Sequence, residues 1–234
     1  MKCVNLLYLP RCTLFSIAFI SLGYVMPSLA GGVALSATRI IYPEVEKQVS
    51  INVTNYDDKE SFLVQSWVVD KLGVKSTSFI VSPLLFVLKP GKMNMLRIMY
   101  NGPALPEGKE SIFYLNNKAI PSVEKKSQAG NTLQIASQSV IKLFVRPKHL
   151  SVNPSEAPAM LRCQLHEGGL IISNTSPYFV TLVNFNVDGK KQPNTMVPPL
   201  SSETVRPSGA TKGAVTYQTL NDYGAITPAL ACKA

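Results

Sequence analysis

Side chains able to carry out catalysis are few in this chain. It has two histidines, His149 and His166, and both lie in polar, turn-like stretches where a solvated imidazole is expected. The sequence contains no Gly-x-Ser-x-Gly elbow, no His-Glu-x-x-His pair and no phosphate-binding glycine loop. No spacing of cysteines and histidines fits a metal site, and no pair of carboxylates stands out. We therefore predict that the protein is not an enzyme and binds neither a metal nor a cofactor.

One lysine stands in an unusual place. Lys142 interrupts the stretch TLQIASQSVIKLFVRP, residues 132–147, which otherwise has the pattern of a long strand. Its apolar residues recur at every second position, at Leu133, Ile135, Ile141, Leu143 and Val145. Near its end both faces become apolar or charged, as in a strand covered on both sides. Two interpretations fit: a central strand whose lysine reaches solvent, or an edge strand offered to another chain, with Lys142 at the base of a cleft.

The elements around this strand have the pattern of antiparallel sandwiches. Residues 33–146 contain seven short stretches, separated by turn residues, and none has a helical period. The segment RPKHLSVNPSEAP, residues 146–158, places three prolines in a polar stretch and is typical of a linker. A second series of short strands follows it. We therefore expect an all-β protein with two sandwich domains, residues 31–148 and 149–234.

The first 30 residues are expected to lie outside these domains. MKCVNLLYLPRCTLFSIAFISLGYVMPSLA has a short basic start, an apolar middle over residues 13–25 and small residues before Ala30. This layout predicts a secretory signal peptide, residues 1–30, that is cleaved on export. An uncleaved anchor is the alternative, but the apolar part is short for a membrane span.

Cysteines and charge narrow the class of protein further. Cys163 and Cys232 remain after removal of the signal, and an even count in an oxidising compartment predicts one disulfide bond. The whole chain carries a formal net charge of +9, but its basic residues are scattered in runs of at most two. Nucleic acid is therefore not an expected partner, whereas partners that carry carboxylates are.

Several motifs, in order along the chain, resemble those of one family. LQIASQSVIKLFVRP is similar to the G1 strand of periplasmic pilus (fimbrial) chaperones, the PapD-like family. ATRIIYP, LKPGKMNMLRI and PEGKESIFYLNNKAIP resemble motifs of its first domain, and NTSPYFVTL and LNDYGA resemble motifs of its second. The resemblance implies two immunoglobulin-like β-sandwiches in a boomerang arrangement. The loop between Pro121 and Leu133 resembles the short F1–G1 loop type.

The resemblance also implies a function in the periplasm. Such a chaperone binds pilus subunits that lack the last strand of their own sandwich, and its G1 strand fills the gap by donor-strand complementation. It then delivers them to an outer-membrane usher. The donor side chains would be Leu133, Ile135 and Ser137. Because a serine buries less apolar area than the large residue usual at the third position, that pocket should gain roughly 1–2 kcal/mol less.

Two further sets of residues follow from the resemblance. Arg39 and Lys142 match the cations that bind the subunit's C-terminal carboxylate, which needs charge-assisted hydrogen bonds when it is buried. Glu110, Arg146 and Asp222 match a salt-bridge network between the two domains. We expect these three residues to support the cleft rather than to touch the subunit.

Two other interpretations deserve comparison with this one. A secreted immunoglobulin-like structural or adhesive fimbrial component is the first alternative, although the chain starts GGVALSATRI after the signal and ends ACKA, unlike a subunit with a donor extension and an aromatic C-terminal strand. A secreted β-sandwich enzyme is the second, and it lacks a catalytic set. The exposed, apolar edge of the G1 strand also predicts transient self-association of free molecules.

Overall fold

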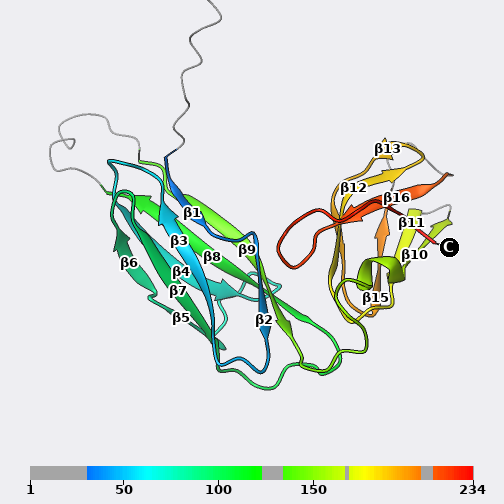
Figure 1. Cartoon of the computed structure of the whole chain (residues 1–234), viewed down its shortest axis with the longest axis horizontal. Coiled ribbons are helices and arrows are strands. Elements are labelled where there is room, and N and C mark those ends of the chain that lie inside the picture. Colours follow the sequence, from blue (N-terminus) through cyan, green and yellow to red (C-terminus); the bar gives the residue numbers. More distant parts are fainter. Residues whose placement is uncertain (1–30, 123–133, 167–168, 207–212, 234) are drawn as a thin grey trace, which may run out of the picture. The chain divides into compact units, whose positions relative to one another are not determined.

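The computed structural model describes residues 31–122, 134–166, 169–206 and 213–233 (Figure 1). The predicted signal peptide, residues 1–30, lies outside this part of the chain, as do Leu133 and most of the predicted F1–G1 loop. The described residues form β-strands and one short 3₁₀ helix, Ala157–Met160. The prediction of an all-β protein is confirmed. In the described ranges, no helix has the length and apolar character needed to cross a membrane.

Residues 33–146 form two β-sheets. The first is four-stranded, with the order β1 (Val33–Leu35), β3 (Val49–Asn55), β7 (Met93–Tyr100) and β5 (Phe79–Ser82). The second is five-stranded, with the order β2 (Arg39–Pro43), β9 (Ser137–Arg146), β8 (Ser111–Pro121), β4 (Phe62–Val69) and β6 (Leu85–Leu88). Nine strands therefore stand where the sequence predicted seven.

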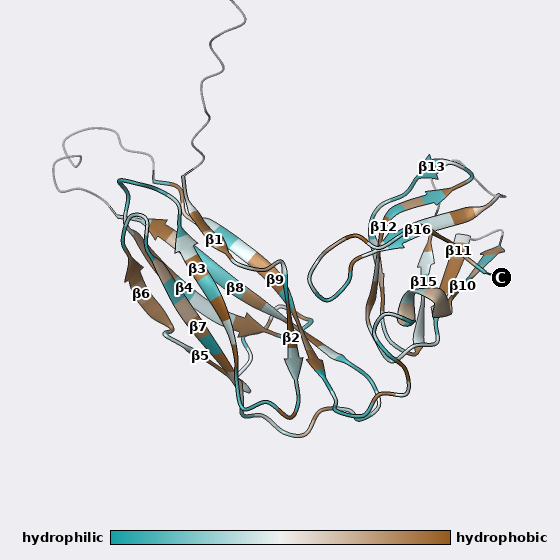
Figure 2. Cartoon of the chain, in the orientation of Figure 1, coloured by the Kyte–Doolittle hydropathy of each residue, from teal (hydrophilic) through white to brown (hydrophobic). Residues whose placement is uncertain are grey.

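The core between these sheets follows from the alternation of side chains along each strand. Ile51 and Val53 on β3 are buried, and so are Leu96 and Ile98 on the neighbouring β7. Hydrophobic residues gather in the strands, and the hydropathy colouring shows β6 as hydrophobic throughout (Figure 2). One continuous cluster of buried apolar side chains results, and it includes residues from both sheets.

The segment VALSATRIIYP departs from the expected antiparallel pattern of short strands. It forms β1 and β2, which belong to different sheets and are separated by Ser36–Thr38. Moreover, β2 pairs with β9 in the parallel direction. Parallel pairing joins segments that are far apart in sequence, so its direction leaves no local signal in the pattern of residues.

The strand that contains Lys142 is shorter than predicted. β9 begins at Ser137 rather than at residue 132, and Ile135 precedes it without strand structure. Its last part is covered on both faces, as predicted, because Leu143, Phe144 and Val145 are all buried.

Residues 161–231 form a second pair of sheets, after a stretch without strands at residues 147–156. One sheet has the order β10 (Leu161–His166), β11 (Gly169–Asn174) and β15 (Ser201–Val205). The other has the order β13 (Lys190–Lys191), β12 (Val180–Val187), β16 (Val215–Thr219) and β17 (Leu230–Ala231), and β14 (Thr195–Val197) pairs with β12. A second cluster of buried apolar side chains lies within this part of the chain.

The predicted disulfide bond is confirmed. Cys163 on β10 and Cys232, directly after β17, are joined with their Cα atoms 5.8 Å apart. The bond links positions 69 residues apart, so it fixes the end of the chain to the first strand of the second pair of sheets.

Candidate functional site

Two cations lie directly opposite each other where β2 meets β9. The register of the parallel pair places Arg39 beside Lys142. The next residue on each strand, Ile40 and Leu143, is buried in the core. Because side chains alternate along a strand, Arg39 and Lys142 both project from the outer face of this sheet.

This cation pair lacks a matching anion in the described structure. Neither Arg39 nor Lys142 forms an ion pair with a residue that the structure describes, whereas Arg146 forms two. The Nη1 atom of Arg39 donates a hydrogen bond of 3.4 Å to the carbonyl oxygen of Leu220, and its Nε atom is buried without a partner. An unpaired buried donor is costly, so the arrangement favours an added acceptor.

The surroundings of both cations act against their charged forms. Burial lowers the pKa of the Lys142 ammonium below its ordinary value, and the neighbouring Arg39 lowers it further. Burial also lowers the pKa of Arg39, although Asp222 and Glu110 act in the opposite direction. A carboxylate placed between the two side chains would relieve the repulsion and accept their hydrogen bonds.

A second charged group surrounds Arg146, at the end of β9. Its Nε atom donates to Glu110 Oε1 at 2.8 Å, and its Nη1 and Nη2 atoms donate to the two oxygens of Asp222 at 2.7 and 2.8 Å. The Arg146 guanidinium also lies over the ring of Tyr178, 5.0 Å from its centroid. The family resemblance had grouped Glu110, Arg146 and Asp222, and the geometry brings all three together.

Glu110 is the most enclosed member of this group, with 4% of its surface exposed. Its Oε2 atom accepts the backbone N–H of Phe179 at 2.9 Å, and its own N–H donates to the carbonyl of Pro177. Burial raises the pKa of the Glu110 carboxyl, although Arg146 and the Phe179 N–H lower it. The pKa of Arg146 is raised, because Asp222 and Glu110 outweigh the effect of burial.

A cavity of about 720 Å³ adjoins both charged groups. Phe144 and Phe179 line it, with ring centroids 5.6 Å apart. Residues from both sequence halves line it, among them Arg39, Ile41, Glu110, Arg146, Tyr178, Asp222 and Tyr223. Sequence reasoning singled out the charged residues but missed Phe144, Phe179 and Tyr223, although the motifs NTSPYFVTL and LNDYGA contain the last two.

The other half of β9 presents an open edge. Residues 137–141 pair with β8 on one side, whereas β2 begins only opposite Lys142. No strand of the described chain pairs with the other edge of residues 137–141. Of the predicted donor residues, Ile135 is 71% exposed, Ser137 is exposed, and Leu133 lies outside the described residues. The free backbone edge therefore ends at the two cations.

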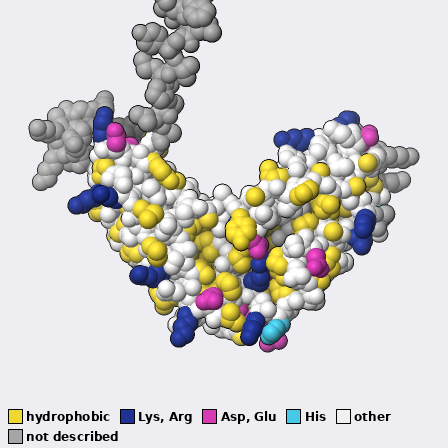
Figure 3. All heavy atoms as spheres, viewed as in Figure 1, with side chains coloured by type: hydrophobic (Ala, Val, Ile, Leu, Met, Phe, Trp, Pro, Cys, Tyr) yellow, Lys and Arg dark blue, Asp and Glu magenta, His cyan; other side chains and the backbone are white. Residues whose placement is uncertain are grey.

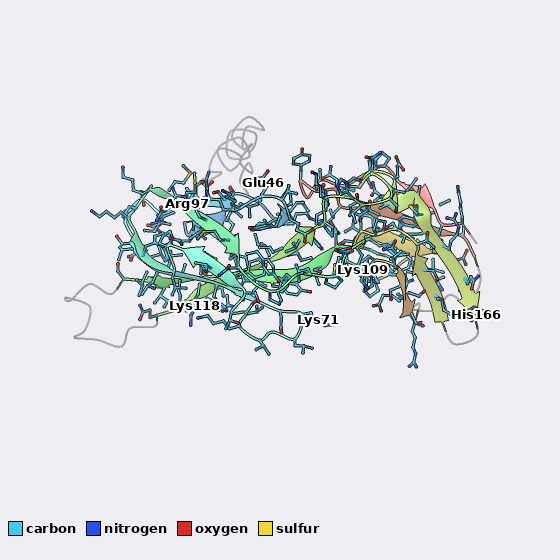
Figure 4. The ribbon with its side chains drawn as sticks, turned by 90° about the horizontal axis from the view of Figure 1, so that it is seen from below. Glu46, Lys71, Arg97, Lys109, Lys118 and His166 are labelled. Atoms are coloured by element: carbon cyan, nitrogen blue, oxygen red, sulfur yellow. A yellow bond between two sulfur atoms is a disulfide. The ribbon has the colours of Figure 1, made fainter. Side chains whose placement is uncertain are left out.

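Basic residues elsewhere do not form a continuous patch in the views of the described chain. On the face shown in Figure 3, lysines and arginines stand singly or in small groups among hydrophobic and uncharged side chains. Figure 4 shows Lys71, Arg97, Lys109 and Lys118 well apart from one another.

Comparison with known protein families gives two matches that together span nearly all of the described chain. Residues 32–151 match the N-terminal domain of PapD, described as a pili and flagellar-assembly chaperone. Residues 156–231 match the C-terminal domain of the pili assembly chaperone PapD.

Individual proteins give the same result. The probable fimbrial chaperone protein ElfD of Escherichia coli O157:H7 is 47% identical over 204 residues, which cover 87% of each protein. The crystal structure of the periplasmic chaperone SfaE matches with a TM-score of 0.77 and 41% identity, over 87% of this chain and 100% of that one. A chain of the Salmonella enterica complex of SafA pilin with the SafB chaperone matches with a TM-score of 0.79 and 25% identity, over 87% of this chain and 96% of that one. The predicted pair of immunoglobulin-like sandwiches is confirmed.

Proposed function

Because the chain belongs to the PapD family of pilus-assembly chaperones, we propose that it binds pilus or fimbrial subunits in the periplasm and keeps them ready for assembly. The observation that carries this proposal is the open edge of β9, which ends at Arg39 and Lys142. An edge supplies backbone hydrogen bonds to an added strand, and the two cations supply a fixed end point for it.

The donor strand completes the subunit by adding both backbone and side chains. Residues 137–141 have free backbone groups, and an extended segment before them would continue the edge. Leu133, Ile135 and Ser137 are the proposed donor side chains, because alternate residues of a strand point to one face. A largely exposed isoleucine such as Ile135 is unfavourable in water, so its burial in a subunit groove favours binding.

Arg39 and Lys142 anchor the C-terminal carboxylate of the subunit. They stand side by side and have no acidic partner in the described ranges, so a carboxylate would gain two charge-assisted contacts without breaking an ion pair. The anchor also fixes the register of the added strand. A shift of one residue would turn every donor side chain to the wrong face.

Glu110, Arg146 and Asp222 form the support of this anchor. Arg146 lies at the end of the same strand as Lys142 and holds carboxylates from two distant segments, 36 and 76 residues away in sequence. Their contacts join the two sandwiches, so they fix the surroundings of the cavity without facing the added strand. The two domains are proposed to extend over residues 31–148 and 149–234.

The remaining features of the proposal follow the family. The protein acts without catalysis or a cofactor, is exported by a cleaved signal at residues 1–30, and passes its subunits to an outer-membrane usher. A short F1–G1 loop between Pro121 and Leu133 precedes the donor strand. The free molecule self-associates transiently through the same open edge. A structural or adhesive fimbrial role is not favoured, because the chain matches chaperone domains along both halves.

Subunit capture tests the proposal directly. The chaperone is produced in the periplasm together with a subunit of the pilus that it serves, and the subunit recovered with it is measured. Lys142→Ala and Ile135→Asp should each strongly reduce recovery, while circular dichroism shows an unchanged fold. Lys118→Ala, a half-buried lysine on neighbouring β8, serves as the control. Full recovery with Lys142→Ala would refute the carboxylate anchor.

A further inference from the structure

An almost fully exposed tyrosine lies at the cavity that Arg39 lines. Tyr223 is 91% exposed and lines the same cavity as Arg39 and Phe144. We propose that the Tyr223 ring packs against the last side chain of a bound subunit and selects for a large apolar residue there. This inference rests on the proposed binding of the subunit's C-terminal carboxylate by Arg39 and Lys142.

The loop that carries Tyr223 is fixed at three points. The carbonyl of Leu220 accepts a hydrogen bond from Arg39, and Asp222 binds Arg146 through both carboxylate oxygens. Gly224 lies against Thr38, where any added side chain would meet the Thr38 hydroxyl, and its φ of 81° favours glycine. The backbone of Tyr223 therefore sits between anchors on both sides, so the position of its Cα atom relative to Arg39 is set before a ligand arrives.

Asn221 fixes the turn itself. Its Oδ1 atom accepts the backbone N–H groups of Tyr223 and Ala225 at 3.0 and 2.9 Å. The Asn221 N–H donates to the carbonyl of Ala225, and its own carbonyl accepts from Gly224, both at 2.9 Å. An ordered backbone loses little conformational entropy on binding, so an aromatic ring carried on this turn contributes more of its contact energy to affinity.

Two other tyrosines of the second sandwich are buried, with hydrogen-bonded hydroxyls, unlike Tyr223. Tyr178 and Tyr217 are buried, and their hydroxyls donate to the carbonyls of Val152 and Pro158. The Tyr223 hydroxyl makes no hydrogen bond to any residue that the structure describes. Both the ring and its hydroxyl are thus available to a ligand, and the position of the cations identifies that ligand as a chain end with a carboxylate. Tyrosine is among the residues that contribute most at protein interfaces.

Peptide binding tests this assignment. The probes are labelled 12-residue peptides of alternating valine and threonine that end in phenylalanine or in glycine, each as free acid and as amide. Wild-type protein should bind the phenylalanine acid roughly 10-fold more tightly than the glycine acid. Tyr223→Ala should abolish that preference, whereas Tyr223→Phe should keep it. Tyr56→Ala removes another exposed tyrosine, one outside the cavity lining, and should change nothing.

The outcomes separate this inference from the proposed function. If Tyr223→Ala keeps the full preference for phenylalanine, the role of Tyr223 is refuted, even when acids still bind better than amides. If wild-type protein binds acids and amides equally, the carboxylate anchor is refuted instead.

Nitration by tetranitromethane gives a second measurement, with the intact chaperone–subunit complex. Tyr223 should be nitrated in the free chaperone and protected in the complex, while Tyr56 reacts in both. Equal reaction of Tyr223 in the two states would also overturn the proposal.

Discussion

Replacing Lys142 with methionine is expected to stabilise the free protein and impair subunit binding at the same time. Lys142 and Arg39 face each other across the β2–β9 pair without an acidic partner in the described chain. Methionine keeps the apolar stem of the lysine and removes its charge, so the repulsion disappears while the packing of the stem is largely kept.

The size of the effect follows from the spacing of the strands. Neighbouring strands lie about 4.8 Å apart. Because two like charges on long side chains turn away from each other, we take the charge separation as about 6 Å. Coulomb's law then gives a repulsion of about 0.7 kcal/mol in bulk water and about 3 kcal/mol at an effective dielectric of about 20. Because Lys142 is only half-buried, solvent screening favours the lower part of this range. We expect Lys142→Met to raise the free energy of unfolding by about 1 kcal/mol at pH 7.

The extra stability of Lys142→Met should also depend on pH and on salt concentration. Because the Lys142 pKa in the folded protein is lowered below its unfolded value of 10.5, the folded state releases this proton first as pH rises. The wild-type protein therefore becomes relatively more stable between the lowered pKa and 10.5, and the advantage of Lys142→Met shrinks there. Added salt should shrink it as well, because about 1 M salt screens charges beyond about 3 Å.

Urea unfolding followed by the fluorescence of Trp67, the single tryptophan, measures this difference without adding ions. Lys118→Met is the matched control, because Lys118 lies on the same sheet opposite Gln65 and Gln138 rather than a charge (Figure 4). The reasoning would be refuted if Lys142→Met were no more stable than wild type at low salt, or if Lys118→Met gained as much.

Three further predictions concern other parts of the molecule. Replacing Cys163 and Cys232 with alanine should cost up to about 4 kcal/mol, as expected for a loop of this length, measured as a fall in the urea midpoint under non-reducing conditions. Arg146→Ala should cost about 3 kcal/mol in the same assay, because it leaves Glu110 buried without its cation; a loss under 1 kcal/mol would contradict this. The N–H groups of Glu60 and Lys59 lower the pKa of Asp57 below 3.8, so its contribution is present above that pH and is lost as pH falls through the lowered pKa. Asp57→Ala should therefore be less stable than wild type at pH 7 and equal to it in strong acid, as measured by thermal unfolding across pH.

Strands could be predicted from the sequence because their signals are local. Alternation at Val49, Ile51 and Val53 depends only on neighbouring residues, and turn residues mark the ends of the strands. The pairing of β2 with β9 could not be predicted in this way, because it joins Arg39 to a residue more than a hundred positions away. The start of β9 was also missed, since the alternation continues to Leu133 although strand structure begins at Ser137.

The residues of the candidate site likewise could not be found from local sequence patterns. Glu110, Arg146 and Asp222 were grouped only through a family resemblance, because nothing in their spacing brings them together. Tyr223 was missed because an exposed tyrosine in a turn has no periodic pattern, and its proposed role depends on the cavity that it lines together with Arg39. Residues whose function arises from tertiary contacts need a structure or a family comparison to be found.

The point where β2 joins β9 would also limit where a bound chain can end. β2 occupies the edge of β9 from Lys142 onward, so an added strand has room only beside residues that precede Lys142. A chain that continued past its last strand would have to leave the sheet at the cations, where its carboxylate would be out of reach. If Arg39 and Lys142 bind the subunit's carboxylate as proposed, this junction would separate a chain that ends at the right place from one that is extended or cut short.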